Sequence, residues 1–174
     1  FVLCFLNKYI NIHMGTEMDI NLGFSTGCFY RSGLGLKRRL EIIRDTGCNA
    51  LELGFVKMDD RDLIEIAKLM PGYFDQFNYV SFHAPILEYG QNEKTEKIFD
   101  LIRGINRRIR KLDLVIFHPN TVKDFSVFGG LDFPVAFENM CRRKATFKYP
   151  GEFKEIFDQN NKLLGAPKNQ YFPL

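Results

Sequence analysis

The sequence lacks most of the motifs that reveal a function at first sight. It contains no tryptophan and no C-x-x-C pair, so the spacing of a zinc knuckle or a redox-active dithiol is missing. No apolar run reaches the roughly 18 residues that a membrane-spanning helix requires. Neither G-x-G-x-x-G nor a P-loop occurs, which weakens the case for nucleotide binding.

Charge and cysteine usage narrow the class of protein further. The net charge of +3 neither requires nor excludes a nucleic-acid partner, although a dedicated nucleic-acid binder usually has a denser basic face. A hydrophobic content of 45% is ordinary for a soluble globular protein. We expect free thiols in a reducing, cytoplasmic compartment for the four cysteines, which are Cys4, Cys28, Cys48 and Cys141.

The first 17 residues carry no functional signal. The apolar stretch FVLCFL has no basic region before it and no small-residue cleavage site after it, so it does not indicate a signal peptide. Met14 and Met18 stand just before the first predicted strand. We therefore expect residues 1–17 to be a disordered or non-native extension and residues 18–174 to form a single domain.

Short apolar runs alternate with helical patterns from residue 20 onward. The runs predict strands over 20–29 (ending in a loop), 49–55, 79–85, 113–120 and 133–140. Apolar spacing and turn residues predict helices over 36–47, 59–70, 95–112 and 152–160. This alternation favours βαβ units in an α/β fold with a parallel sheet. An open doubly wound sheet and part of a (β/α)8 barrel both fit it.

Three of the predicted strands end in the same way. The segments VSFH (80–83), VIFH (115–118) and VAFE (135–138) each lead through a phenylalanine to a histidine or a glutamate. Because side chains alternate along a strand, the valine and phenylalanine of each segment point away from the final residue. In a barrel, His83, His118 and Glu138 would be the last inward side chains, at the same level of three adjacent strands.

The three strand-end residues are candidate metal ligands. Neighbouring strands lie about 4.8 Å apart, so side chains from three of them can converge on one ion. Two histidines and a carboxylate suit Zn²⁺, or Mn²⁺ or Fe²⁺ where more oxygen ligands are available. Glu138 is also the candidate catalytic residue. The competing interpretation is that each histidine is simply a satisfied residue at the end of its strand.

Other polar residues at strand ends are candidates for contact with substrate. Glu52 shares a face with Ala50 and Gly54, so it could bind substrate, position a ligand, or pair with a neighbour as a buried carboxylate. Asn139 could bond a substrate or a loop backbone. Arg142, in the basic run CRRK, could reach a phosphate, and Ser25 and Thr26 could touch substrate where the first strand ends.

The triplet HAP, HPN and ENM, in that order and at strand ends, resembles the xylose-isomerase-like barrel superfamily from about residue 20 to about residue 164. That superfamily includes sugar phosphate isomerases and epimerases and the endonuclease IV type of abasic-site nuclease. The resemblance implies a (β/α)8 TIM barrel with metal bound by His83, His118 and Glu138. A sugar or sugar phosphate would be the substrate, its adjacent oxygens held by Zn or Mn while an acidic residue moves a proton.

The sequence departs from the nuclease branch of this superfamily. That branch reads HAPY and HPG, whereas this chain reads HAPI and HPN, and it has no basic and aromatic insertions suited to opening DNA. An isomerase or epimerase is therefore the favoured interpretation. A zinc phosphodiesterase acting on abasic DNA is the alternative.

The length departs from the superfamily as well. A complete barrel takes about 250 residues, and only the first five βα units are recognisable here. We therefore expect an incomplete and inactive form, with self-association through the open sheet edges. A non-enzymatic product is the third interpretation.

Overall fold

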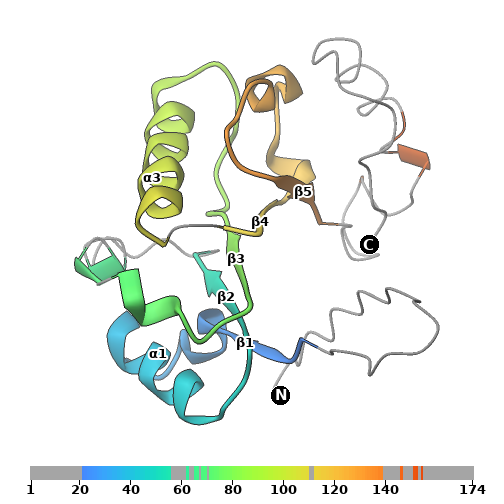
Figure 1. Ribbon diagram of the computed structural model, residues 1–174. Helices are drawn as coiled ribbons and strands as arrows, with labels where there is room; N and C mark the ends of the chain where they lie inside the picture. The colour runs from blue at the N-terminus through green and yellow to red at the C-terminus, as the bar shows by residue number, and fades with distance from the viewer. Residues whose placement is uncertain are drawn as a thin grey trace, which may run out of the picture.

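The computed structural model describes residues 21–55, 62, 65–66, 68–69, 71–109, 112–138, 146, 151–152 and 154. These residues contain one parallel five-stranded sheet with the strands in the order of the chain (Figure 1). Its strands are β1 (Gly23–Ser25), β2 (Ala50–Gly54), β3 (Tyr79–His83), β4 (Leu114–Phe117) and β5 (Val135–Phe137). The predicted α/β class and parallel sheet are confirmed, and β1 and β5 are the edges of the sheet within the described residues.

The strands are shorter than the sequence predicted because polar side chains and prolines stop them early. β1 ends where the Ser25 hydroxyl accepts a hydrogen bond from the Gly27 amide, which starts the 3-10 helix η1 (Thr26–Phe29). β4 gives way to η3 (Pro119–Thr121), whose first residue has no amide hydrogen to continue the ladder. Two further 3-10 turns are η2 (Pro71–Phe74) and η4 (Phe125–Phe128).

Two helices, α1 and α3, lie within the described residues. α1 (Leu36–Asp45) ends near Gly47, whose φ of 71° lies in the left-handed region that glycine adopts without strain. α3 (Glu93–Ile109) begins where the Asn92 side chain accepts a hydrogen bond from the Thr95 amide. Of the predicted helices at 59–70 and 152–160, only isolated residues are described. Those at 62, 65, 66 and 68 in the first and at 152 and 154 in the second are helical.

The core lies between the helices and one face of the sheet. Phe82, Val115 and Phe117 are completely buried on that face, as the alternation in the three repeated segments predicted. Apolar side chains of the two helices pack against them: Leu36, Leu40 and Ile43 from α1, and Ile98, Phe99, Ile102 and Ile105 from α3. Each such burial contributes about 1.5–3 kcal/mol, so this face fixes the strands in place.

The opposite face carries the polar residues. Parallel pairing places Ser25 beside Glu52 and Glu52 beside Ser81. One step further along the strands, Gly54 pairs with His83, and His83 pairs with Ile116. Polar side chains therefore lie together at the carboxyl edge of the sheet.

Candidate metal centre

Three neighbouring strands, β3, β4 and β5, each place one candidate ligand at the carboxyl edge of the sheet. His83 is the last residue of β3, His118 directly follows β4, and Glu138 directly follows β5. The Glu138 amide donates a hydrogen bond to the Phe117 carbonyl, which holds the residue against the end of β4. The backbone of His118 is extended, with φ −83° and ψ 110°, so its side chain keeps the direction set by the strand.

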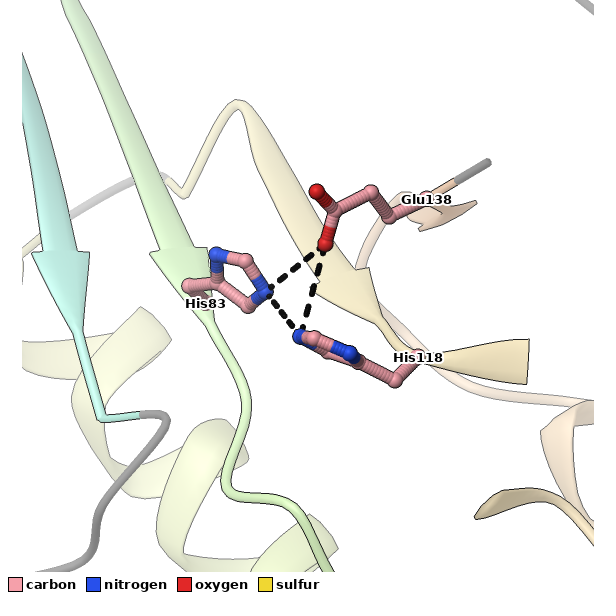
Figure 2. Close-up of side chains that lie close together, drawn as sticks. All are labelled: His83, His118 and Glu138. Atoms are coloured by element: carbon pink, nitrogen blue, oxygen red, sulfur yellow. Dashed lines mark hydrogen bonds and ion pairs between the residues drawn. The ribbon is translucent and has the colours of Figure 1, made fainter. Parts of the chain in front are cut away.

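The three side chains point toward one another (Figure 2). The Nε2 atoms of His83 and His118 are 2.8 Å apart. The Glu138 Oε2 atom lies 3.5 Å from the first of them and 3.4 Å from the second. Ligand atoms held at about 2.1 Å from a tetrahedral zinc ion are about 3.4 Å apart. The two separations to Glu138 match this value, whereas the two Nε2 atoms are closer together and would have to move apart by about 0.6 Å to hold such an ion.

The donor set also fits a metal ion. Two imidazole nitrogens and one carboxylate oxygen from the described residues could hold a divalent cation. The two histidine side chains are 11% and 15% exposed, whereas the Glu138 side chain is 36% exposed. The histidine side of the centre is therefore buried against the sheet, and the Glu138 side is open to solvent. Three protein ligands with an open side are the arrangement of catalytic sites, which reserve a position for water or substrate.

The register corrects one prediction about the geometry. His83 pairs with Ile116, and Ile116 pairs with Ala136, so His83 stands two residues below His118 and Glu138 in the ladder. The three residues share a face but not a level. The side chains nevertheless meet, because their length spans the offset of two residues.

Electrostatic coupling between these side chains shifts their pKa values. Burial alone would lower the pKa of His83, but its contacts with Glu138 and Glu52 outweigh burial and raise that pKa to about 9. The contact with His83 in turn holds the pKa of Glu138 below its usual range, against the opposite effect of burial. In the metal-free protein a protonated imidazole and an ionised carboxylate therefore face each other at neutral pH.

The remaining predicted site residues have different outcomes. Glu52 lies beside the ligand His83, with its Oε2 atom 3.6 Å from the His83 Nδ1 atom. Ser25 and Thr26 are buried, and the Thr26 hydroxyl accepts a hydrogen bond from the Gly54 amide, so both help to close the end of β2. Asn139 and Arg142 lie outside the described residues.

Hydrogen bonds of a buried tyrosine, Tyr89, join the loops after β3 and β4, and the sequence did not indicate this role. Tyr89 is completely buried, and its hydroxyl donates a hydrogen bond to the Pro85 carbonyl at 2.7 Å. Its backbone accepts from the Lys123 amide and donates to the Thr121 carbonyl. Both loops begin at a histidine of the centre, so Tyr89 fixes the two histidines relative to each other. The sequence around Tyr89 gave no local signal of this role, because its backbone partners Thr121 and Lys123 come from the segment after β4.

Comparison with family models, with curated proteins and with solved structures found no match to this chain. The resemblance to the xylose-isomerase-like superfamily accordingly stays a prediction. Two observations bear on the other predictions about the class of protein. Cys28 and Cys48 are free thiols, and none of the helices in the described ranges has the length and hydrophobicity needed to cross a bilayer.

Proposed function

We propose that the chain binds one divalent transition-metal ion, Zn²⁺ or Mn²⁺, through His83, His118 and Glu138, and that it is an isomerase- or epimerase-like protein with a site for a sugar or sugar phosphate, in a form that is itself predicted to be inactive. The observation that carries the metal site is the triangle of ligand atoms at the carboxyl edge, with sides of 2.8, 3.4 and 3.5 Å. The three residues stand at the ends of the neighbouring strands β3, β4 and β5, so the convergence is built into the sheet.

The proposal includes the architecture around the site. The strand order β1-β2-β3-β4-β5 has no reversal, whereas a doubly wound sheet changes direction at a switch point. A sequential parallel order is the order of a (β/α)8 barrel, in which active sites lie at the carboxyl ends of the strands. The sheet is proposed to be part of such a barrel, of the xylose-isomerase-like type.

The ion and the residues near it are proposed to have different roles in the reaction. When bound, the ion would polarise adjacent oxygens of a substrate. Glu138 has the most exposed side chain of the three ligands, and its carboxylate oxygen that does not face the histidines could accept a proton from a substrate carbon. Asn139 directly follows Glu138 in the sequence and Arg142 stands four residues after it, and both are proposed to bind substrate hydroxyl or phosphate groups.

The metal site is tested first. The purified chain is stripped with EDTA, dialysed, and titrated with Zn²⁺ and with Mn²⁺ while bound metal is measured by mass spectrometry. We expect one ion per chain, and we expect Glu138→Gln to bind it more weakly. A stoichiometry near zero for both metals would overturn the metal centre.

The reaction is tested on the metal-loaded chain by proton exchange. Aldoses, ketoses and their phosphates are incubated in D₂O, and deuterium at the carbon next to the carbonyl is followed by NMR. Isomerases and epimerases that move a proton incorporate deuterium even where the equilibrium is unfavourable. Exchange in a sugar or sugar phosphate would support this class of reaction and contradict the predicted inactivity, whereas cleavage of an abasic duplex would assign the site to phosphodiester chemistry instead.

A further inference from the structure

We infer that Glu52 is a positioning residue for the metal centre: its carboxylate holds the His83 ring with the proton on Nδ1, so that Nε2 is presented to the ion. The inference rests on the proposed metal site and deepens it, because it assigns Glu52 to orienting the metal ligand His83 rather than to binding substrate. It follows from the positions of the two ring nitrogens of His83, because Nε2 faces the Glu138 carboxylate and Nδ1 faces the Glu52 carboxylate.

The two ring nitrogens of His83 face opposite partners. Nε2 lies 2.8 Å from the His118 Nε2 atom and 3.5 Å from the Glu138 Oε2 atom, inside the centre. Nδ1 lies 3.6 Å from the Glu52 Oε2 atom, outside it. An imidazole that ligates through one nitrogen carries its proton on the other, and a carboxylate facing that second nitrogen selects this tautomer.

The sheet brings Glu52 to this position. Glu52 pairs with Ser81, which stands two residues before His83 on the same face of β3. The end of β2 is held by Gly54, at which an added Cβ would come within 2.9 Å of the Ser25 Oγ atom and 3.0 Å of the Gly27 nitrogen. Close packing of the end of β1 and the start of η1 against β2 therefore fixes the backbone that carries the Glu52 side chain.

Burial strengthens the contact between Glu52 and His83. The side chains of Glu52 and His83 are only 16% and 11% exposed, so neither group is well hydrated. A buried carboxylate needs a donor or a positive charge, and among the described residues Glu52 has its ion pair with His83. Ligation of Nε2 makes the Nδ1 proton more acidic, which strengthens the contact with Glu52. Outer carboxylates of this kind typically change metal affinity 10- to 100-fold.

The first test compares Zn²⁺ affinities. The full chain and its Glu52→Gln variant are stripped with EDTA and titrated with Zn²⁺ against a chromophoric chelator. We expect the variant to bind about 10- to 100-fold more weakly with an unchanged circular dichroism spectrum. Glu88→Gln is the matched control, because the Glu88 side chain is 70% exposed and lies 4.0 Å from Lys123 on the surface. A Glu52→Gln affinity equal to that of the wild type would overturn the inference.

The second test reads the tautomer directly and does not depend on any variant. Long-range ¹H–¹⁵N correlation spectra of the Zn²⁺-loaded wild type show which nitrogen of His83 carries the proton. We expect a protonated Nδ1 and a ligated Nε2, and the reverse assignment would overturn the inference even if Glu52→Gln fails to fold. A wild-type chain that binds no Zn²⁺ refutes the metal centre itself, whereas normal wild-type binding with an unaffected variant refutes only the role of Glu52.

Discussion

The Nε2 atoms of His83 and His118 lie 2.8 Å apart, although the sheet pairs His83 with Ile116 rather than with His118. Two imidazole nitrogens at this distance are satisfied by one shared proton or by one shared cation, because two N–H groups pointing at each other would repel. The Glu138 carboxylate beside both adds negative charge. The centre therefore has two satisfied forms, protonated and metal-bound, and they exclude each other.

Removal of either histidine should abolish tight metal binding. His118→Ala leaves one nitrogen and one oxygen ligand from the described set, and we expect Zn²⁺ affinity to fall by more than about 100-fold, beyond the effect of an outer residue. Isothermal titration of the stripped proteins measures it. His13→Ala is the control, since it also removes one of the chain's three histidines but lies far from these residues in the sequence. Equal losses in both variants would mean that Zn²⁺ binds elsewhere.

Metal binding near neutral pH should release a proton. The contacts of His83 with Glu138 and Glu52 raise its pKa to about 9 against the effect of burial, so the ring is protonated at pH 7.5 before the ion arrives. Ligation requires the neutral ring, and we expect about one proton to be released per Zn²⁺ bound. Titrations in buffers of different ionisation enthalpy give this number. A heat of binding that does not depend on the buffer would contradict the exchange.

Stability of the metal-free protein should fall as the pH rises above neutrality. The pKa of His83 is raised in the folded chain, so protonation stabilises the fold fully below the unfolded value of 6.5 and is lost as the pH rises to about 9. The contribution at stake is on the order of 3 kcal/mol. Urea unfolding in EDTA at pH 6, 7.5 and 9 measures it. His83→Gln should lose this part of the pH dependence, and identical slopes for both proteins would count against the assignment.

Tyr89→Phe should destabilise the chain and loosen the centre. The substitution keeps the ring that packs against Phe99 and Phe117 but removes the hydroxyl that donates to the Pro85 carbonyl. Leaving a buried carbonyl without its donor costs about 1–3 kcal/mol. Urea unfolding measures the loss, and Zn²⁺ titration measures the effect on the histidines. Tyr30→Phe is the control, because Tyr30 is half exposed. Equal stability of the two variants would show that the hydroxyl contributes nothing.

Features of the site that depend on local sequence could be predicted, whereas features that depend on the pairing of distant segments could not. His83, His118 and Glu138 could be predicted to share a face and an edge, because alternation and strand ends are local properties. Their stagger could not, because the register between parallel strands depends on how the whole sheet tilts. The partner of Glu52 was hidden for the same reason: alternation placed its side chain on the correct face, but only the pairing of β2 with β3 shows that it meets His83.

Two glycine substitutions should change stability in opposite directions. At Gly54 an added methyl group meets the Ser25 Oγ atom at 2.9 Å and the Gly27 nitrogen at 3.0 Å, and the second of these is backbone that cannot move aside cheaply. We expect Gly54→Ala to lower the free energy of unfolding by about 1–3 kcal/mol.

Gly104 lies inside α3, where an added Cβ has no atom within 4 Å to meet. Gly104→Ala should therefore raise the free energy of unfolding by up to about 1 kcal/mol, since alanine loses less backbone entropy in a helix than glycine does. Urea unfolding of both variants under the same conditions decides the matter. A stabilising Gly54→Ala would show that β1 and β2 do not pack closely at their ends, which would also remove the fixed backbone on which the position of Glu52 depends.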